Sequence, residues 1–387
     1  MASKEDGSPS HSPREDLLEG STPQPPTAPS PPQRRPALNL GFLQNPDLYH
    51  QLFVDDVPKA FLDSTNQPSL DAPLPDLLQG GHFRRGAEKA LRDLLAHHGD
   101  DSVHMLQLLY TRLACLVLIS RPDFAAQEAL PLLDLMARNP PGVQDIVQIM
   151  PWELRLLLVR LQSIGAADGG RRGIMALYAL AGEVRADLRY AQSHGDSENA
   201  AIWTRRLHDL GLRVCDALVE MGELETATRH LDTLAEVDLE ELVYRKALLK
   251  IRVGDVAGAR KCTDQLQNTA RKQALESLLE VADGNYSSAV RGWNYLAENH
   301  PDHDSFAQNA AVSLLYTDQI AAARDVLEHL ATRLSSFPTL LFNLSTVYEL
   351  CTERAIDRKT ILAQRAADKI PGPESGGWER STFEFKL

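Results

Sequence analysis

The sequence lacks the features that mark most membrane proteins and metal-binding proteins. It contains four cysteines among 387 residues, and Cys115, Cys215, Cys262 and Cys351 all lie far apart, without the short spacing of a zinc site. No stretch approaches the ~18 apolar residues that cross a bilayer, and the N-terminus has no apolar signal-peptide core. We therefore expect reduced core thiols in a soluble, cytoplasmic protein that does not insert into membranes.

An excess of positive charge is also missing. The chain has 40 Lys and Arg against 53 Asp and Glu, a formal net charge of −13. Binding to nucleic acid or to an anionic membrane needs clustered basic side chains. The composition therefore argues against nucleic acid as the main partner.

Motifs of catalysis are absent too. The chain contains no Gly-x-Ser-x-Gly elbow and no His-Glu-x-x-His helix. The glycine-rich stretch 165–173 lacks the Lys and the hydroxyl residue of a phosphate-binding loop. His97, His98 and His104 cluster near a helix end, but no Cys, Asp or Glu at helical spacing completes a metal site. The sequence predicts no enzyme, no cofactor and no metal.

The sequence does contain a repeated motif, in which a turn residue is followed five positions later by alanine. The turn residues lie 32, 30 and 34 positions apart, and a proline closes the third copy. The pairs and the closing residue are Gly222 with Ala227, Gly254 with Ala259, Gly284 with Ala289, Asp318 with Ala323, and Pro301. This spacing of turn residues, alanines and a closing proline is typical of the tetratricopeptide repeat (TPR), in which each repeat is a pair of helices.

A second pattern supports the same repeat register. Seven residues before each turn, the first helix of the pair presents a small side chain. These residues are Cys215, Ala247, Ser277, Ala311 and Ser345. Two helices approach closely only where the residue at their crossing is small, and neighbouring pairs must stack to bury their apolar faces. The sequence therefore predicts an all-α, TPR-like α-α superhelix, a solenoid of helical hairpins.

Composition divides the chain into five expected regions. Residues 1–36 contain nine prolines and few large apolar groups, so we expect a disordered Pro/Ser-rich tail. The remaining regions are an extended linker with short helices over 37–80, irregular helical hairpins over 81–195, TPR repeats over 196–370 and a C-terminal tail over 371–387. We expect residues 38–80 to lie against the first helices or against a partner.

The chaperone-type TPR clamp, which grips a peptide carboxylate, is an alternative use of such repeats. Asn309 and Asn343 lie nine residues before a turn, where a clamp places its central asparagine. The preceding helix, however, offers Ala274 and Leu278 at the positions of the clamp's Lys and Asn, and Thr339 and Asn343 replace its basic pair. We expect both asparagines to hydrogen-bond between repeats or to a folded partner. A cochaperone-like peptide-binding adaptor remains the alternative hypothesis.

The last two repeats resemble a known family. Residues 309–316 (NAAVSLLY) and 341–350 (LFNLSTVYEL) are similar to the C-terminal signature of the subunit 12 family of the trafficking protein particle (TRAPP) complex. The resemblance extends over about residues 80–365. Animal members carry a much longer N-terminal extension than the ~36 residues here, which implies a fungal-type member.

The resemblance implies a function that the repeat pattern alone does not. It implies a non-catalytic accessory subunit of TRAPP III, a Rab guanine-nucleotide exchange complex of ER-to-Golgi traffic and autophagy. Such a scaffold would bind other large TRAPP subunits, contact a Rab-family GTPase only indirectly, and reach Golgi and ER–Golgi membranes through the complex. The candidate protein-interaction residues are Asn309, Asn343, Tyr316 and Tyr348.

Overall fold

The computed structural model describes residues 40–372, except 56, 70, 98–100, 141, 166–167, 235–237, 268, 334–337 and 352. The described residues form helices and turns, with no strand among them. The predicted all-α class is therefore confirmed. The tail predicted over residues 1–36 lies outside the described residues, as does the C-terminal tail beyond residue 372.

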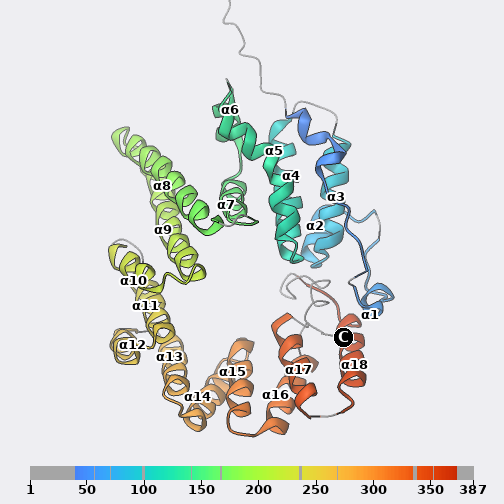
Figure 1. The fold of residues 1–387 in the computed structure, drawn as a ribbon, viewed down its shortest axis with the longest axis vertical. Coiled ribbons are helices and arrows are strands. Elements are labelled where there is room, and N and C mark those ends of the chain that lie inside the picture. The colour runs from blue at the N-terminus through green and yellow to red at the C-terminus, as the bar shows by residue number, and fades with distance from the viewer. Residues whose placement is uncertain are drawn as a thin grey trace, which may run out of the picture. The chain divides into compact units, whose positions relative to one another are not determined.

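The helices follow one another along the chain in hairpins (Figure 1). The short elements near the N-terminus are η1 (Gly41–Gln44), η2 (Pro46–Leu48), α1 (Lys59–Leu62) and α2 (Leu74–Gln79). The next helices are α3 (Phe83–Leu95), α4 (Ser102–Leu118), α5 (Pro122–Arg138), α6 (Val143–Ile149), α7 (Trp152–Leu161) and α8 (Gly169–Ser193). The repeat region contains α9 (Ser197–Glu220), α10 (Leu224–Thr233), α11 (Leu239–Val253), α12 (Val256–Thr263), α13 (Thr269–Ala282), α14 (Tyr286–Asn299), α15 (Asp304–Leu315), α16 (Ile320–Arg333), α17 (Pro338–Cys351) and α18 (Ala355–Ala367).

The boundary that we predicted after residue 195 separates two helices that belong together. α8 and α9 pack along each other as one long hairpin, and Gly195 lies in the turn between them with a φ of +70°. Their shared core includes Leu180, Val184, Leu210 and Val214, all 5% exposed or less. The predicted boundary after residue 195 therefore falls in the turn of a helical hairpin.

Polar caps fix where several helices begin. The side chains of Asp101, Asp196, Asp238 and Asp255 each accept a hydrogen bond from a backbone N–H in the first turn of the helix that follows. Such a cap satisfies one of the backbone donors that have no partner inside the helix. The caps therefore place the starts of α4, α9, α11 and α12.

The turn glycines adopt the backbone conformation that their residue type allows. Gly222, Gly254 and Gly284 have φ values of +80°, +88° and +79°. This left-handed region strains residues that carry a Cβ, so glycine is favoured after a helix. Asp318, which stands in the fourth turn, has a φ of +59°. A short polar side chain tolerates that conformation best among residues other than glycine.

The small residues of the repeats lie at helix crossings. Ala227, Ala259, Ala289 and Ala323 are each 0% exposed, and Ala311 and Ser345 are each 1% exposed. Space at these crossings is short, since a Cβ added to Gly292 of α14 would lie 2.3 Å from the Ser277 Oγ of α13. The apolar clusters around them join successive hairpins, so stacking builds the core.

A buried ion pair fastens the N-terminal segment to the first hairpins. Arg112 of α4 and Glu128 of α5 are 1% and 0% exposed, and the Arg112 Nη2 donates to the Glu128 Oε1 over 2.9 Å. Both also bind the backbone of His50, whose ring stacks on Phe124 at 4.1 Å. Removing one partner of such a pair leaves an uncompensated buried charge, which costs about 3–5 kcal/mol.

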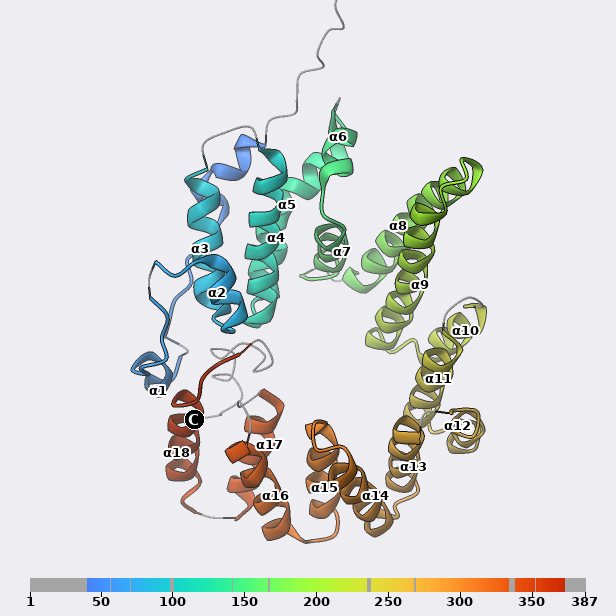
Figure 2. The ribbon, with the colours of Figure 1, turned by 180° about the vertical axis from the view of Figure 1, so that it is seen from behind.

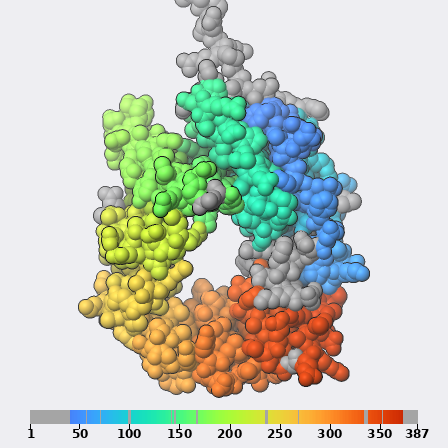
Figure 3. Space-filling view, in the orientation of Figure 1, coloured from blue at the N-terminus to red at the C-terminus, as the bar shows by residue number. Residues whose placement is uncertain are grey.

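Residues 57–67, which we call the strap, run from this region to the other end of the repeats. Val57 and Phe61 are 6% and 0% exposed within the apolar cluster of α15 to α18. The Ser64 Oγ donates to the carbonyl of Ala367 over 2.6 Å, and the Asn66 Nδ2 donates to the carbonyl of Lys369 over 2.9 Å. Figures 2 and 3 show the blue α1 beside the red α18. The strap therefore caps the last helix, whose terminal carbonyls have no partner within it.

Among the described helices, none combines the length and the apolar character that a bilayer span requires.

Replacing Ala311 by Trp should destabilise the protein, because the indole must fit into a crossing where the alanine is 1% exposed. Overpacking of this kind costs about 1–3 kcal/mol or more. The measurement is the midpoint of thermal or urea unfolding followed by circular dichroism. Val312→Trp is the matched control, because Val312 is 37% exposed on the same helix. Equal midpoints for the two variants would contradict the repeat register.

Replacing Phe61 by Ala should release the strap from α18, because Phe61 is 0% exposed and a Phe→Ala change in a core costs about 3–5 kcal/mol. Hydrogen exchange measured by mass spectrometry should show faster exchange over residues 362–369, where the strap binds. Leu62→Ala is the control, since Leu62 is 40% exposed. Unchanged exchange in the Phe61 variant would disprove the strap contact.

Candidate protein-interaction site

The two predicted asparagines lie on the first helices of the last two repeats. The Asn343 Nδ2 of α17 donates to the Gln308 Oε1 of α15 over 3.2 Å, so it links neighbouring repeats. Asn309 is half-buried beside it, and its backbone carbonyl accepts a hydrogen bond from the Ser313 Oγ. A partner that contacts this face would therefore meet an amide pair of α15 and α17, Gln308 and Asn343, that already bonds internally.

The two predicted tyrosines differ in accessibility. Tyr316 is 63% exposed, and its ring stacks on Tyr286 with centroids 4.6 Å apart. Tyr348 is 4% exposed, and its hydroxyl donates to the Glu328 Oε1 over 2.9 Å. Burial raises the pKa of Tyr348, and the Glu328 carboxylate raises it further. Tyr348 therefore joins α17 to α16 inside the fold and is not accessible to a partner, whereas Tyr316 is.

Two of the positions that a peptide clamp would need lie in the core, and none carries a cation. Ala274 is 8% exposed, and Leu278 packs between two apolar clusters of the repeats. Thr339, where a clamp would hold a basic residue, is exposed at the start of α17. None of these side chains can hold the carboxylate of a peptide by charge.

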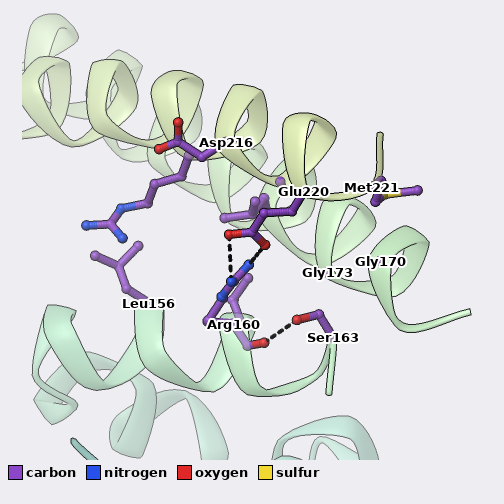
Figure 4. A pocket seen from close by; sticks show the side chains of 12 residues that line it. Leu156, Arg160, Ser163, Gly170, Gly173, Asp216, Glu220 and Met221 are labelled. Atoms are coloured by element: carbon purple, nitrogen blue, oxygen red, sulfur yellow. Dashed lines mark hydrogen bonds and ion pairs between the residues drawn. The ribbon is translucent and has the colours of Figure 1, made fainter. Parts of the chain in front are cut away.

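A cavity of about 480 Å³ lies between α7, α8 and α9 (Figure 4). Leu156 and Val159 of α7 form part of its apolar lining, and Arg160 and Glu220 cross its mouth. The Arg160 Nη2 donates to the Glu220 Oε1 over 2.8 Å, and both side chains are 54% exposed. An exposed pair of this kind contributes little stability.

Two glycines of the glycine-rich stretch, Gly170 and Gly173, line this cavity and belong to a helix. Gly169, Gly170 and Gly173 lie in the first turns of α8. A Cβ added to Gly169 would lie 2.0 Å from the Ser163 carbonyl oxygen, and one added to Gly170 would lie 2.7 Å from the Met221 Cγ. The glycines therefore allow a close approach of chain segments, which is a packing role.

The titratable groups of the described chain do not gather into a metal site. No group of three or more His, Cys, Asp or Glu side chains there is placed to hold an ion. His97 and His104 lie with ring centroids 5.3 Å apart, and His98 lies outside the described residues. Cys115 and Cys215 are buried, and burial raises the pKa of the Cys215 thiol to about 11.

Comparison with known proteins relates the chain to one protein in two species. It is 23% identical over 313 residues to human trafficking protein particle complex subunit 12, and 24% identical over 309 residues to the mouse protein. The resemblance to subunit 12 is confirmed. These matches cover 71% and 70% of this chain but only 42% and 38% of the relatives, so the chain spans about two fifths of their length. No protein-family model matches.

Among solved structures, the chain matches a tetratricopeptide repeat protein from Parabacteroides merdae. It is 16% identical, with a TM-score of 0.40, and the match covers 72% of this chain and 98% of that one.

Sequence reasoning missed an aromatic and basic cluster on α7 and α9. Trp152 and Trp203 lie 51 positions apart in the sequence, and the structure brings their rings to 6.5 Å. Arg206 lies over both rings. The sequence signal that could have indicated this cluster is Trp203 followed one helical turn later by Arg206, because tryptophan and arginine are enriched at protein interfaces.

Gly169→Ala should destabilise the protein by about 1–3 kcal/mol, because its methyl group would collide with the Ser163 carbonyl oxygen of the backbone. Gly182→Ala, in the same helix, should stabilise it by about 0.5–1 kcal/mol, because a Cβ there meets no atom within 4 Å and alanine is the better helix former. Urea unfolding of both variants measures the two opposite shifts. Shifts of the same sign would contradict the packing role of Gly169.

Proposed function

We propose that the chain is a non-catalytic scaffold subunit of a TRAPP complex, of the TRAPP III type. In this function it binds other large subunits of the complex, and the complex as a whole acts on a Rab-family GTPase in ER-to-Golgi traffic and autophagy. The chain works in the cytoplasm and reaches Golgi and ER–Golgi membranes through the complex. The sequence relation to subunit 12 over 71% of the chain carries the proposal.

The architecture supports a scaffold. Stacked hairpins present long lateral faces, which suit contacts with folded proteins. The exposed Tyr316, just after the end of α15, stacks on the half-buried Tyr286 at the start of α14. Asn309 and Asn343 lie on the neighbouring first helices, and we propose that Tyr316 and these amides face a bound subunit.

The alternative, an autonomous adaptor that grips peptide carboxylates, has little support. Ala274 and Leu278 stand where a clamp needs Lys and Asn, and both contribute to the apolar packing of the repeats. Asn343 bonds to Gln308 instead of pointing its amide at a ligand. A carboxylate bound there would lose its water without gaining a cation.

Affinity purification from the native host tests the proposal. With a tag on the endogenous chain, other TRAPP subunits should co-purify in near-equal amounts and co-elute with it on gel filtration. The Ala311→Trp chain should lose these subunits with its fold. Recovery of chaperones without TRAPP subunits would favour the adaptor and overturn the scaffold.

A nucleotide-exchange assay tests the non-catalytic part of the proposal. Complex purified from cells that lack this chain should still exchange nucleotide on its Rab-family GTPase in solution. Loss of that activity, restored by adding the purified chain, would contradict a purely structural role.

A further inference from the structure

One hairpin of the chain is much longer than its neighbours. α8 and α9 have 25 and 24 residues, whereas α7 and α10 have 10 each. At 1.5 Å per residue, α8 is about 37 Å long and α7 about 15 Å, so roughly 20 Å of the hairpin has no α7 beside it. Figures 1 and 2 show the far ends of α8 and α9 together, beyond the ends of α7 and α10. This length mismatch interrupts the stacking of the repeats.

A cavity of about 950 Å³ lies where the stacking is interrupted. Val143 and Met150 line it on one side, and Tyr190 of α8 and Trp203 of α9 line it on the other. Trp152, at the start of α7, forms its base. We call this cavity the tryptophan slot. Its size is that of a site that takes several side chains of a bound segment.

Two indole rings hold one guanidinium at the slot. The Trp152 and Trp203 rings meet edge to face at an interplanar angle of 81°. The Arg206 Cζ lies 4.6 Å from the centroid of the Trp152 ring and 4.7 Å from that of the Trp203 ring. Stacking restricts the arginine before any ligand arrives, so it loses less freedom on forming hydrogen bonds.

The donors of Arg206 are not used within the described chain. No hydrogen bond or ion pair there involves its guanidinium, which has five N–H donors. Neighbouring charges are engaged, since Arg155 pairs with Glu183 and the Asp196 carboxylate caps the start of α9. Glu153 and Asp187 attract the Arg206 charge through space without a hydrogen bond. The arginine is therefore available to an acceptor from outside.

We propose that the tryptophan slot binds an amphipathic helix of a partner protein, with one acidic side chain seated on Arg206 and apolar side chains against Trp152 and Trp203. A helix of about 13 residues matches the ~20 Å of α8 and α9 that extends beyond α7, where the slot separates the hairpin from α6. Trp and Arg at the centre of an interface carry a large share of the binding energy. The proposal rests on the scaffold function only in requiring a protein partner.

The charges around the slot restrict the sequence of that helix. Glu153 and Asp187 repel further negative charge, so the slot favours a single carboxylate flanked by apolar residues over an acidic run. Tyr190 is 67% exposed at the open side of the slot and offers a further apolar ring with a polar tip.

Selection from a displayed library of 14-residue helical peptides tests the proposal. The bait is the full chain, with counter-selection against the Trp203→Ala/Arg206→Gln double variant. Enriched peptides should carry one Asp or Glu, with Leu, Ile, Met or Phe three or four positions away. An affinity measured by fluorescence anisotropy should fall at least tenfold with Arg206→Gln and remain unchanged with Arg205→Gln, the exposed neighbouring arginine.

A charge swap sharpens the test. Changing Arg206 to Glu should abolish binding, and exchanging the acidic residue of the peptide for Arg should restore part of it. Circular dichroism should show all variants folded. Enrichment of basic peptides, equal binding to Arg206→Gln, or no enrichment over the double variant would each overturn the proposal.

The experiments distinguish a wrong slot proposal from a wrong scaffold proposal. If TRAPP subunits co-purify with both the native chain and the Arg206→Gln chain while no peptide is selected, the slot proposal fails and the scaffold stands. If acidic amphipathic peptides bind but TRAPP subunits do not co-purify, the slot stands and the complex assignment fails.

Discussion

The distance between helices at their crossings constrains the rest of this structure. Ala247, Ser277, Ala311 and Ser345 lie at 5% exposure or less at these crossings. A larger side chain would push the hairpin apart, and the next hairpin would lose the apolar face on which it stacks. Each repeat depends on its neighbour in this way, so one small residue per helix pair fixes the spacing of the array.

The repeats could be predicted from the sequence because residues within each repeat set the spacing of its helices. The sequence pattern predicts first helices over 239–253, 270–282, 305–316 and 339–351. α11 spans its predicted range, α13 and α17 each begin one residue earlier, and α15 is shifted by one residue at both ends. Glycine turns and small crossing residues act within one repeat, so a single pass along the chain detects them. α6 was missed, because seven residues after a Pro-Pro pair carry too short a pattern.

Features that join distant segments could not be predicted. His50 reaches Glu128 and Arg112, and Ser64 reaches Ala367 across 303 positions, so no local pattern announces either contact. The candidate interaction residues show the same difference between local features and contacts of distant segments. Tyr316 is exposed, as an interaction residue must be. Tyr348, which we selected from the corresponding segment of the next repeat, is 4% exposed, and its hydroxyl bonds to Glu328 of α16. Trp152 and Trp203 lie 51 positions apart, so their contact likewise leaves no local pattern in the sequence.

In a repeat array, partners should bind where a helix face has no neighbouring repeat packed against it. The usual places are its two ends, yet here the chain covers parts of both, with residues 40–53 on the first hairpins and the strap on α18. Between α9, α11 and α13 the repeats are tied by a ladder in which Arg245 and Arg271 share Glu241. Exposed pairs of this kind each contribute at most about 1 kcal/mol, but they hold neighbouring helices in register. Beside the far ends of α8 and α9 the array is interrupted by the tryptophan slot, where among the described residues the Arg155–Glu183 ion pair links α7 to α8. An aromatic and cationic cluster at that point is better explained by a missing partner helix than by the needs of the fold.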